Sequence, residues 1–523
     1  MATLRLSREV VGLLLAVATL VGCRSRTRPP AGTQAPRDTI VFATTSDATT
    51  LDPAESSNIE SDVINLSIYE GLLGFDSEAR VVGKLAERWG VAVDGVTWTF
   101  HLRRGVRFHD GTALDAAAVK ESLDRLRDPV ALHRNHPLLA MIARVNVIDS
   151  HTVAVVTAFP FGSFEATIAN LDADIISPAA LAKWGTQYGK SGDAAVGTGP
   201  FKLASWKKDL EIVLERNEDY WGSKPRIRRA IYRPVPDADA KVAALEAGDV
   251  DIINRIPAAV ADRLEWNSGI VVRRRPTLSS YLLRFNNGRR PFNDRRVRQA
   301  ISLAIDRRDI VDHLMPGTAA VPTGPLSTLV RNSARLGEIA RDLPAARRLL
   351  REAGYPNGFK TRITTTARYT MGIELAEALE AQLKDVGIDA PIDVIERPIF
   401  MGGTATQRAA DDREMYIMTI ASSTADADWG LRPRFLSSSP INQDRYSNPE
   451  FDRVIMQAMT ETDMEKRRAL YKRAQQIVYL EDPPVLWLFE NFNVTAARRQ
   501  LRDLTLWPQN TVTFERAYLS AEP

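Results

Sequence analysis

His133 and His136 are the only two histidines of this chain that lie close together in sequence, and they could serve a metal ion. The 523 residues include six histidines, and this pair is three positions apart in a turn-like stretch that ends at Pro137. A metal site needs further ligands, and the stretch offers no third one. An ordinary histidine role is therefore the favoured interpretation, with metal binding as the alternative.

Motifs of catalytic centres are missing from the sequence. It contains no G-x-S-x-G nucleophile elbow, no H-E-x-x-H zinc motif and no G-x-x-x-x-G-K-[ST] phosphate loop. Carboxylate pairs occur, as they do in any chain with 65 acidic residues. We therefore expect no enzymatic activity and no cofactor.

Cys23, the single cysteine, has a different chemical role. Arg5 and Arg8 precede an apolar run from residue 10 that ends in Leu-Val-Gly-Cys. A cationic start, about a dozen apolar residues and then small residues are typical of a secretory signal, which is too short to span a bilayer. The ending resembles a bacterial lipobox, in which the cysteine is lipidated and begins the mature protein. We expect residues 1–22 to be a lipoprotein signal peptide; an ordinary signal peptide with an incidental thiol is the alternative.

Composition describes the rest of the chain as an exported globular protein. Residues 23–37 include three prolines and no apolar cluster, which indicates a lipid-anchored linker. The whole chain is 44% hydrophobic and 25% charged, with a net charge of +3, so nucleic acid is not a favoured partner. Its length predicts two or three domains, and one cysteine cannot form an internal disulfide.

Strand and helix patterns alternate along the chain, which predicts an α/β fold. Strands are expected at 38–42 and 95–102, the latter followed by a second ribbon strand at 105–108. Helices are expected where capping residues precede apolar stripes. These predicted helices are 62–69, 115–126 after Asp115, one after Asp342 ending at Gly354, one from Leu375 to Gly387, and one from a capping box at Thr462–Glu465 to residue 482.

Three blocks carry a family resemblance: TLDPAES, SIYEGLLGFD and TWTFHLRRGVRFHDGTALDAAAVKESL. Together they resemble the substrate-binding proteins of peptide, dipeptide and nickel importers, a class of extracellular solute-binding proteins (family 5) that serve ATP-driven transporters. Three further matches follow in order: G-T-G-P-F at 197–201, N-x-x-Y-W at 217–221 and L-x-x-G-x-x-D at 245–251. We read the glycines as turn-formers and favour packing over ligand contact for Tyr220 and Trp221.

The resemblance implies a type II periplasmic-binding-protein fold of the large peptide-binding class, which is α/β and two-lobed. Its first lobe would span 38–283, with an inserted subdomain at about 81–195. The second lobe would span 284–485, and 486–523 would return to the first lobe. Two crossing strands would form the hinge about which the lobes close on a ligand.

Candidate ligand contacts also follow from the resemblance. The family places an aspartate for the ligand ammonium in a loop that corresponds to 420–430 here, so Asp426 is the first candidate and Ser423 the alternative. A serine cannot neutralise a buried ammonium, which leaves dipeptide specificity open. Further candidates are Asp428, Trp429, Ser46, Tyr281, Trp487 and Phe489, and the carboxylate partner stays open among Arg284, Arg432 and Arg434.

The resemblance predicts a binding component of an ABC importer that captures oligopeptides or dipeptides. Its expected partners are a peptide ligand, a permease with its ATPase, and the membrane through a lipid anchor on Cys23; the protein itself is expected to be a monomer. A nickel- or metal-chelate binder, or an oligosaccharide binder, of the same fold is the alternative. An exported enzyme and an adaptor that has lost transport are the competing classes.

Overall fold

The computed structural model describes residues 38–56, 58–128, 139–191, 193–367, 369, 371–396, 400, 413–509 and 511–521. The predictions for the signal peptide, Cys23, the linker, His133 and His136 lie outside these residues. Within the described ranges, no helix has both the length and the apolar character that crossing a membrane requires. Residues 36–523 form one structural unit, to which the fold below belongs.

A mixed sheet of eleven strands runs through the described part of the chain. Its order is β15-β14-β16-β12-β17-β11-β1-β10-β9-β8, and β13 pairs with β17 beside this path. The pairs that β1 and β14 form are parallel, whereas β12 and β17 pair antiparallel with their neighbours. The bounds are β1 (Thr39–Thr44), β8 (Phe201–Lys207), β9 (Glu211–Arg216), β10 (Arg229–Pro234), β11 (Ile252–Asn254), β12 (Ile270–Phe285), β13 (Ala319–Ala320), β14 (Ile363–Thr365), β15 (Ile392–Val394), β16 (Met415–Ala421) and β17 (Val485–Arg498).

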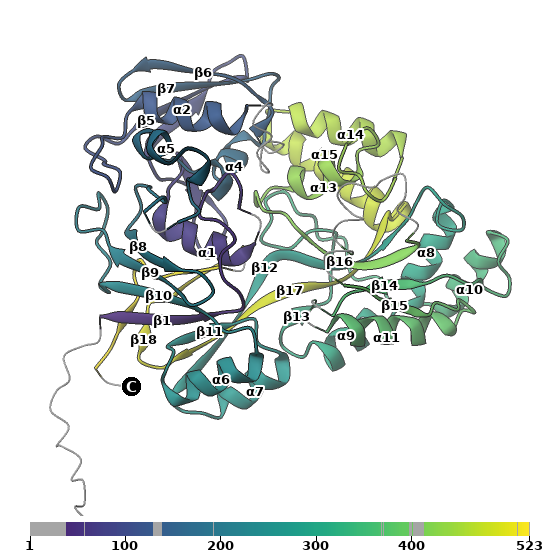
Figure 1. The fold of residues 1–523 in the computed structure, drawn as a ribbon. Coiled ribbons are helices and arrows are strands. Elements are labelled where there is room, and N and C mark those ends of the chain that lie inside the picture. Colours follow the sequence, from purple (N-terminus) through teal and green to yellow (C-terminus); the bar gives the residue numbers. More distant parts are fainter. Residues whose placement is uncertain are drawn as a thin grey trace, which may run out of the picture. The chain divides into compact units, whose positions relative to one another are not determined.

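Strands β12 and β17 form a long antiparallel pair that joins the two lobes (Figure 1). Their ladder is regular up to Pro276 and shifts register before Ser280, which lies opposite Glu490. Proline has no N–H group to donate, which suits it to a break in a ladder. Beyond the shift, Tyr281 stacks on Phe489 and both join the core of the second lobe.

The two ends of the β12–β17 pair pack in different hydrophobic cores. Leu283 and Leu486 pack in the second-lobe core, whereas Ile270 and Val494 pack in a first-lobe core with the helices after β10 and β11. Residues on the two sides of the register shift therefore pack in different cores, and the lobe boundaries at 283 and 485 stay predictions.

First-lobe helices begin and end at residues suited to these positions. The Asn58 side chain accepts a hydrogen bond from the Ser61 N–H at the start of α1, and Gly248 ends α6 with φ of +84°. Glycine adopts this left-handed conformation without strain, as the sequence predicted. The elements are α1 (Ile59–Ile68), α6 (Ala238–Ala247), α7 (Ala258–Glu265), β18 (Leu501–Arg502), β19 (Thr505–Trp507), β20 (Thr511–Thr513) and β21 (Tyr518–Leu519).

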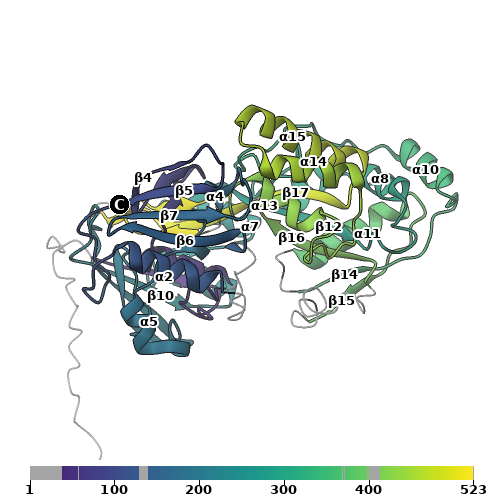
Figure 2. The same cartoon turned by 90° about the horizontal axis from the view of Figure 1, so that it is seen from above.

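A four-stranded antiparallel sheet, in the order β4-β5-β7-β6, forms the core of the inserted subdomain. Figure 2 shows these strands side by side with α2 next to β6. The Asp115 side chain caps α2 as predicted, accepting from the Ala118 N–H at 2.9 Å. The elements here are β2 (Leu73–Phe75), β3 (Val81–Gly83), β4 (Ala86–Val91), β5 (Thr97–Leu102), α2 (Ala116–Leu126), β6 (Ile142–Asp149), β7 (Thr152–Thr157), α4 (Phe164–Ile168), η1 (Leu171–Ala173), α5 (Pro178–Trp184) and η2 (Gly185–Gln187).

Second-lobe helices form two groups. The helices α8, α9, α10 and α11 share one core with the end of the large sheet, whereas α13, α14, α15 and η3 share a core with the inserted subdomain. Gly354 and Gly387 follow α10 and α11 with φ of +92° and +81°, as their sequence pattern predicted. The bounds are α8 (Arg295–Ala304), α9 (Arg307–Leu314), α10 (Leu343–Glu352), α11 (Gly372–Lys384), α13 (Ala427–Phe435), α14 (Pro449–Thr460), α15 (Met464–Gln476) and η3 (Ile477–Glu481).

Two local predictions were wrong. Residues 105–108 form no strand, because Gly105 has φ of +75° and turns the chain, leaving an isolated bridge at Arg107. The cap of α15 is Asp463 rather than Thr462, since the Asp463 carboxylate accepts from the Glu465 and Lys466 N–H groups. A carboxylate one position later reaches the same free N–H groups, so the helix starts one residue further on.

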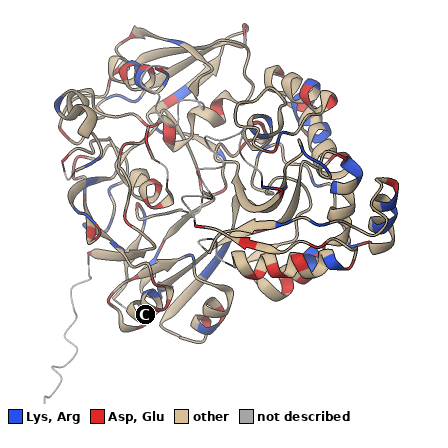
Figure 3. Ribbon diagram, turned by 45° about the vertical axis from the view of Figure 1, so that its right-hand side comes forward, with Lys and Arg blue, Asp and Glu red and all other residues tan. Residues whose placement is uncertain are grey.

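Basic and acidic residues are interspersed along the ribbon (Figure 3). The full sequence has 68 basic and 65 acidic residues, so their numbers are also balanced.

Candidate functional site

A cavity of about 270 Å³ lies beside the crossing of β12 and β17. Its first-lobe wall comes from the start of α1, the β11–α7 loop and β17, and its second-lobe wall from α9, the start of α11 and β16. We call it the Arg255 cavity. Its lining residues are Ile59, Arg255, Ile256, Pro257, Ala258, Ser279, Tyr281, Leu314, Met315, Thr318, Tyr369, Met371, Thr419, Asn491, Phe492 and Val494.

Arg255 is the one charged side chain among the described residues that line this cavity. Its Nη1 donates to Glu60 Oε1 at 3.0 Å, and 29% of its side chain remains exposed. Its backbone has φ of +55°, and Met371 on the opposite wall has φ of +57°. Non-glycine residues rarely adopt this conformation, which is strained and concentrates at ligand-binding sites. Strain on both walls of one cavity therefore marks it as a candidate site.

Lys241, on α6, lies behind the first-lobe wall and is 2% exposed. Its Nζ donates to Thr45 Oγ1 and to the Asn254 carbonyl oxygen, at 3.2 Å each. Burial lowers the pKa of Lys241 to about 8, with a smaller lowering from the charge of Arg255 and an opposing effect of Glu60. Two cations and one carboxylate therefore meet at this wall.

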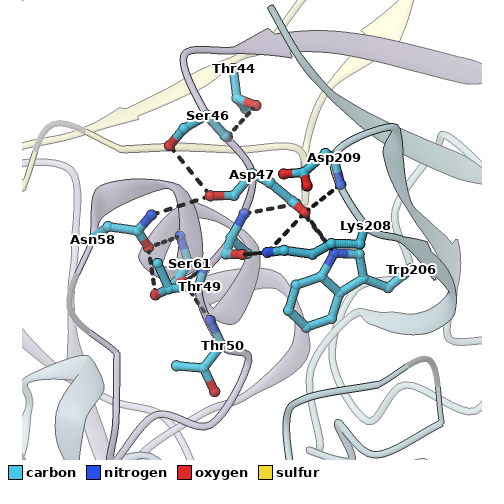
Figure 4. Close-up of polar contacts among 11 residues, drawn as sticks. Thr44, Ser46, Asp47, Thr49, Thr50, Asn58, Ser61, Trp206, Lys208 and Asp209 are labelled. Atoms are coloured by element: carbon cyan, nitrogen blue, oxygen red, sulfur yellow. Dashed lines mark hydrogen bonds and ion pairs between the residues drawn. The ribbon is translucent and has the colours of Figure 1, made fainter. Parts of the chain in front are cut away.

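The loop between β1 and α1 is fixed by Asp47 (Figure 4). The Asp47 carboxylate accepts from Trp206 Nε1 at 3.1 Å and from the Asp209 N–H at 2.9 Å, and it pairs with Lys208 at 3.2 Å. Ser46, a predicted ligand contact, is exposed in this loop, and its Oγ donates to the Asp47 carbonyl oxygen at 3.3 Å. It does not line the Arg255 cavity, and a ligand contact of Ser46 stays a prediction.

Of the predicted aromatic contacts, Tyr281 lines the Arg255 cavity. Phe489 is buried behind it, with ring centroids 4.6 Å apart in a stacked arrangement. Trp487 is 4% exposed and packs edge-on against Phe435 and Tyr479. The structure therefore brings Tyr281 to a cavity and gives Phe489 and Trp487 packing roles.

Asp426 has a different environment from the one the sequence suggested. It is fully buried, and its carboxylate accepts from Arg331 Nε at 2.9 Å, from Ser163 Oγ at 2.8 Å and from the Asp428 N–H at 3.1 Å. It thus caps α13 and is neutralised by an arginine of the protein. The Asp426 carboxylate is thus engaged by protein donors, and its contact with a ligand ammonium stays a prediction.

The neighbours of Asp426 are also occupied by protein partners. Asp428 is 2% exposed and pairs with Arg432 at 2.7 Å, and Trp429 is half-buried. Ser423 Oγ accepts from Asn170 Nδ2 at 3.4 Å. The predicted site residues therefore do not meet at one place: Tyr281 lines the cavity, whereas Asp426, Asp428 and Trp429 lie at the start of α13.

The three arginines considered for a ligand carboxylate all have protein partners. Arg284 forms a two-pronged pair with the buried Asp444, with both distances at 2.8 Å. Arg432 pairs with Asp428, and Arg434 Nη2 donates to the Ala421 carbonyl oxygen at 3.0 Å.

Arg255 was not among the residues predicted from the sequence. Its one sequence signal is that it directly follows a short buried strand, where open α/β sheets place ligand-binding loops.

A second polar group, the Glu70 cluster, gathers the sequence motifs away from the cavity. Glu70 of S-I-Y-E-G accepts from Thr198 Oγ1 at 2.9 Å, from the Tyr220 hydroxyl at 2.8 Å and from Trp221 Nε1 at 2.7 Å. Burial raises the pKa of Glu70, and it raises the pKa of nearby Asp174 well above its usual range. The motif residues thus pack and hydrogen-bond with one another, as favoured for Tyr220 and Trp221.

Residues 80–443 match the model of the bacterial extracellular solute-binding proteins, family 5. The chain belongs to this family. It is 32% identical to the glutathione-binding protein GsiB of Pectobacterium atrosepticum over 495 residues, which cover 92% of this chain and 94% of that protein. The GsiB protein of Escherichia coli strain K12 is 32% identical over 494 residues, with 92% and 94% covered.

Solved structures share the fold over the same length. The periplasmic binding protein DppA from Helicobacter pylori, in complex with the peptide STSA, has a TM-score of 0.79 and 27% identity, with 92% of this chain and 98% of that chain covered. AgaA from A. tumefacien R10, in complex with agropinic acid, has a TM-score of 0.79 and 26% identity, with 92% and 99% covered. These matches confirm the predicted two-lobed, type II α/β fold.

Family membership also confirms the general function. The chain is a solute-binding protein of an ABC importer that delivers its ligand to a permease, and membership supports its export. Solute-binding proteins are binders rather than enzymes, in agreement with the missing catalytic motifs.

Proposed function

We propose that this chain captures a short peptide in the Arg255 cavity, with glutathione as the first ligand to test. The cavity carries the proposal because residues of both lobes line it beside the strands that join them. Relatives named for glutathione binding match 92% of the chain, and a structural neighbour holds the peptide STSA. A ligand held there would contact both lobes at once, which is how closure about a hinge is coupled to binding.

The size and lining of the cavity favour a short peptide over a long one. Its volume of about 270 Å³ is near the lower end of ligand pockets, which span about 300–1,000 Å³. Ser279, Thr419 and Asn491 supply hydroxyl and amide groups for a peptide backbone, while Met315 and Phe492 supply apolar surface. Such a lining fixes the main chain and leaves side-chain choice broad.

The predicted ligand contacts take separate roles under this proposal. Tyr281 meets the ligand, and Phe489 supports the Tyr281 ring. Asp426 caps α13, Asp428 pairs with Arg432 within that helix, and Trp429 is half-buried there. Trp487 packs in the core, and Ser46 hydrogen-bonds within the loop before α1.

Cys23 provides the attachment to the membrane in this proposal. Lipidation at Cys23 after removal of residues 1–22 would tether the protein through residues 23–37, and the protein would act as a monomer. Mass spectrometry of the mature protein tests this directly: we expect an N-terminal cysteine with lipid mass, absent in Cys23→Ser. An unmodified residue 23 would contradict the anchor while leaving ligand binding untouched.

Calorimetric titration tests the ligand class. We expect the wild-type protein to bind glutathione or members of a mixed dipeptide and tripeptide pool with one site per chain. Native mass spectrometry of protein purified from its source checks the same point, since a closed binding protein can retain its cargo. A single metal chelate or an oligosaccharide in place of peptides would overturn the peptide assignment.

A further inference from the structure

We propose that the first-lobe wall of the Arg255 cavity is a carboxylate subsite, in which Arg255 binds one carboxylate of the ligand and Glu60 holds the guanidinium until the ligand arrives. This inference rests on the proposed function, because it names the chemical group by which a short peptide would be recognised. It adds a specificity residue that the sequence did not single out.

Charge balance is the first observation behind this subsite. Arg255 and Lys241 bring two positive charges to the wall, and Glu60 brings one negative charge. Glu60 is 7% exposed and Lys241 is 2% exposed, so water screens this surplus poorly. A buried charge without a counter-charge is costly, and a ligand carboxylate supplies the missing one. A surplus of one charge matches a single carboxylate better than a dianionic phosphate.

Placement of the Arg255 guanidinium is the second observation. Its Nη1 is engaged by Glu60 at 3.0 Å, and no described residue accepts a hydrogen bond from its other nitrogens. Arginine binds carboxylates through two parallel N–H groups. Glu60 engages only Nη1, so the other N–H groups of Arg255 are left for a ligand carboxylate. The side chain keeps 29% of its surface exposed and lines the cavity, so a ligand can reach it.

Backbone strain is the third observation. The left-handed conformation of Arg255, with φ of +55°, is fixed by its own N–H, which donates to the Val494 carbonyl oxygen at 2.9 Å. Strained residues persist where the surrounding structure holds them and where their position serves a site. The strained backbone of Arg255 is therefore explained if it is needed to direct the guanidinium to the ligand.

Two substitutions with opposite expected effects test the subsite. Each protein is titrated with glutathione and with a mixed tripeptide pool, made once with free C-terminal carboxylates and once as C-terminal amides. Arg255→Gln should weaken binding of the free acids by about tenfold or more and abolish their preference over the amides. Glu60→Gln should strengthen binding of the free acids several-fold, because it removes the competing carboxylate, and leave amide binding unchanged.

Controls separate binding from folding. Arg263→Gln changes an exposed arginine on neighbouring α7 that does not line the cavity, and it should bind as the wild type does. Arg255→Lys keeps the charge and should fall between the wild type and Arg255→Gln, and thermal melts of every variant report folding. A misfolded protein loses all binding, whereas this proposal expects a selective loss of acid over amide.

The outcomes separate this inference from the proposed function. An acid-over-amide preference that survives in Arg255→Gln would overturn the subsite and leave peptide binding in place. If the wild-type protein binds neither the acids nor the amides, the subsite and the proposed function both fail. Selective loss in Arg255→Gln together with a gain in Glu60→Gln would support both.

Discussion

The Glu70 cluster and the Arg255 cavity both bring charged side chains together in the interior, but they use these side chains differently. At Glu70, three protein donors converge on one carboxylate. At Arg255, the Glu60 carboxylate pairs with Arg255, and Lys241 lies behind the same wall, beside an open volume of about 270 Å³. The Glu70 carboxylate takes its partners from the protein, whereas we propose that the Arg255 cavity takes a further partner from the ligand. Substitutions at Glu70 should therefore change stability, and substitutions at the cavity should change binding.

The largest expected effect is at the Glu70 cluster. Glu70→Ala removes the acceptor of the buried Thr198 hydroxyl and of the half-buried Tyr220 and Trp221 donors, and a buried donor left unsatisfied costs about 1–3 kcal/mol. We expect the free energy of unfolding in urea to fall by about 3 kcal/mol or more, with little change in peptide affinity while the protein is folded. Glu87→Ala, at an exposed position of β4, is the matched control. A loss of affinity without a loss of stability would reverse the comparison.

Glu490 lies on β17 at the register shift between the lobes, and burial raises its pKa to about 7. The folded protein then binds more protons than the unfolded chain between pH 4.5 and 7, so stability falls as the pH rises through this range. Each pKa unit corresponds to about 1.36 kcal/mol. The rise in the pKa of Glu490 from 4.5 to about 7 therefore amounts to a loss of about 3 kcal/mol in the free energy of unfolding.

Urea unfolding of the wild type and Glu490→Gln across this range measures the effect. The substitution should remove this part of the pH slope, so its advantage over the wild type should grow with pH. If the free energies of unfolding of the two proteins change in parallel with pH, ionisation of Glu490 does not destabilise the folded protein, and this prediction is wrong.

Filling the cavity should abolish binding without unfolding the protein. Thr419 lines the cavity on β16 and is only half-buried, so a tryptophan there occupies ligand space without entering the close-packed core. We expect Thr419→Trp to weaken peptide binding about a hundredfold, equivalent to about 2.7 kcal/mol, with Thr419→Ser as the control. Unchanged affinity in Thr419→Trp would place the ligand elsewhere.

Asp426 provides the smallest expected effect and decides between its two roles. Asp426→Asn removes the negative charge facing Arg331 and weakens the cap of α13, which should lower stability by about 1–2 kcal/mol. Peptide affinity should change by less than tenfold. A loss of about 2–5 kcal/mol in binding free energy would instead identify Asp426 as the ammonium partner.

Much of the fold could be predicted from local signals. Asp115 and Asp342 cap their helices, and Gly248, Gly354 and Gly387 end theirs with positive φ, because these roles depend on a few neighbouring residues. Turn and cap chemistry of this kind is visible in the sequence. Where a local prediction was wrong, a neighbouring residue served the same role: Asp463, rather than Thr462, caps α15.

The site was harder to predict, because its residues meet only in three dimensions. Glu60, Lys241 and Arg255 come from three separate elements and belong to no motif. Asp426 matched a family loop, yet its partner Arg331 lies 95 positions away and could not be paired with it from the sequence. The sequence motifs therefore correspond to the Glu70 cluster, whose residues hydrogen-bond with one another, and they include no residue that identifies the cavity.

A crystal structure with the tightest-binding tripeptide tests the central claim most directly, because it shows where the ligand lies. We predict ligand density in the cavity between Arg255 and Tyr281, with a ligand carboxylate within hydrogen-bonding distance of the Arg255 guanidinium. Density against the Asp426 loop, with the Arg255 cavity filled only by water, would contradict the account.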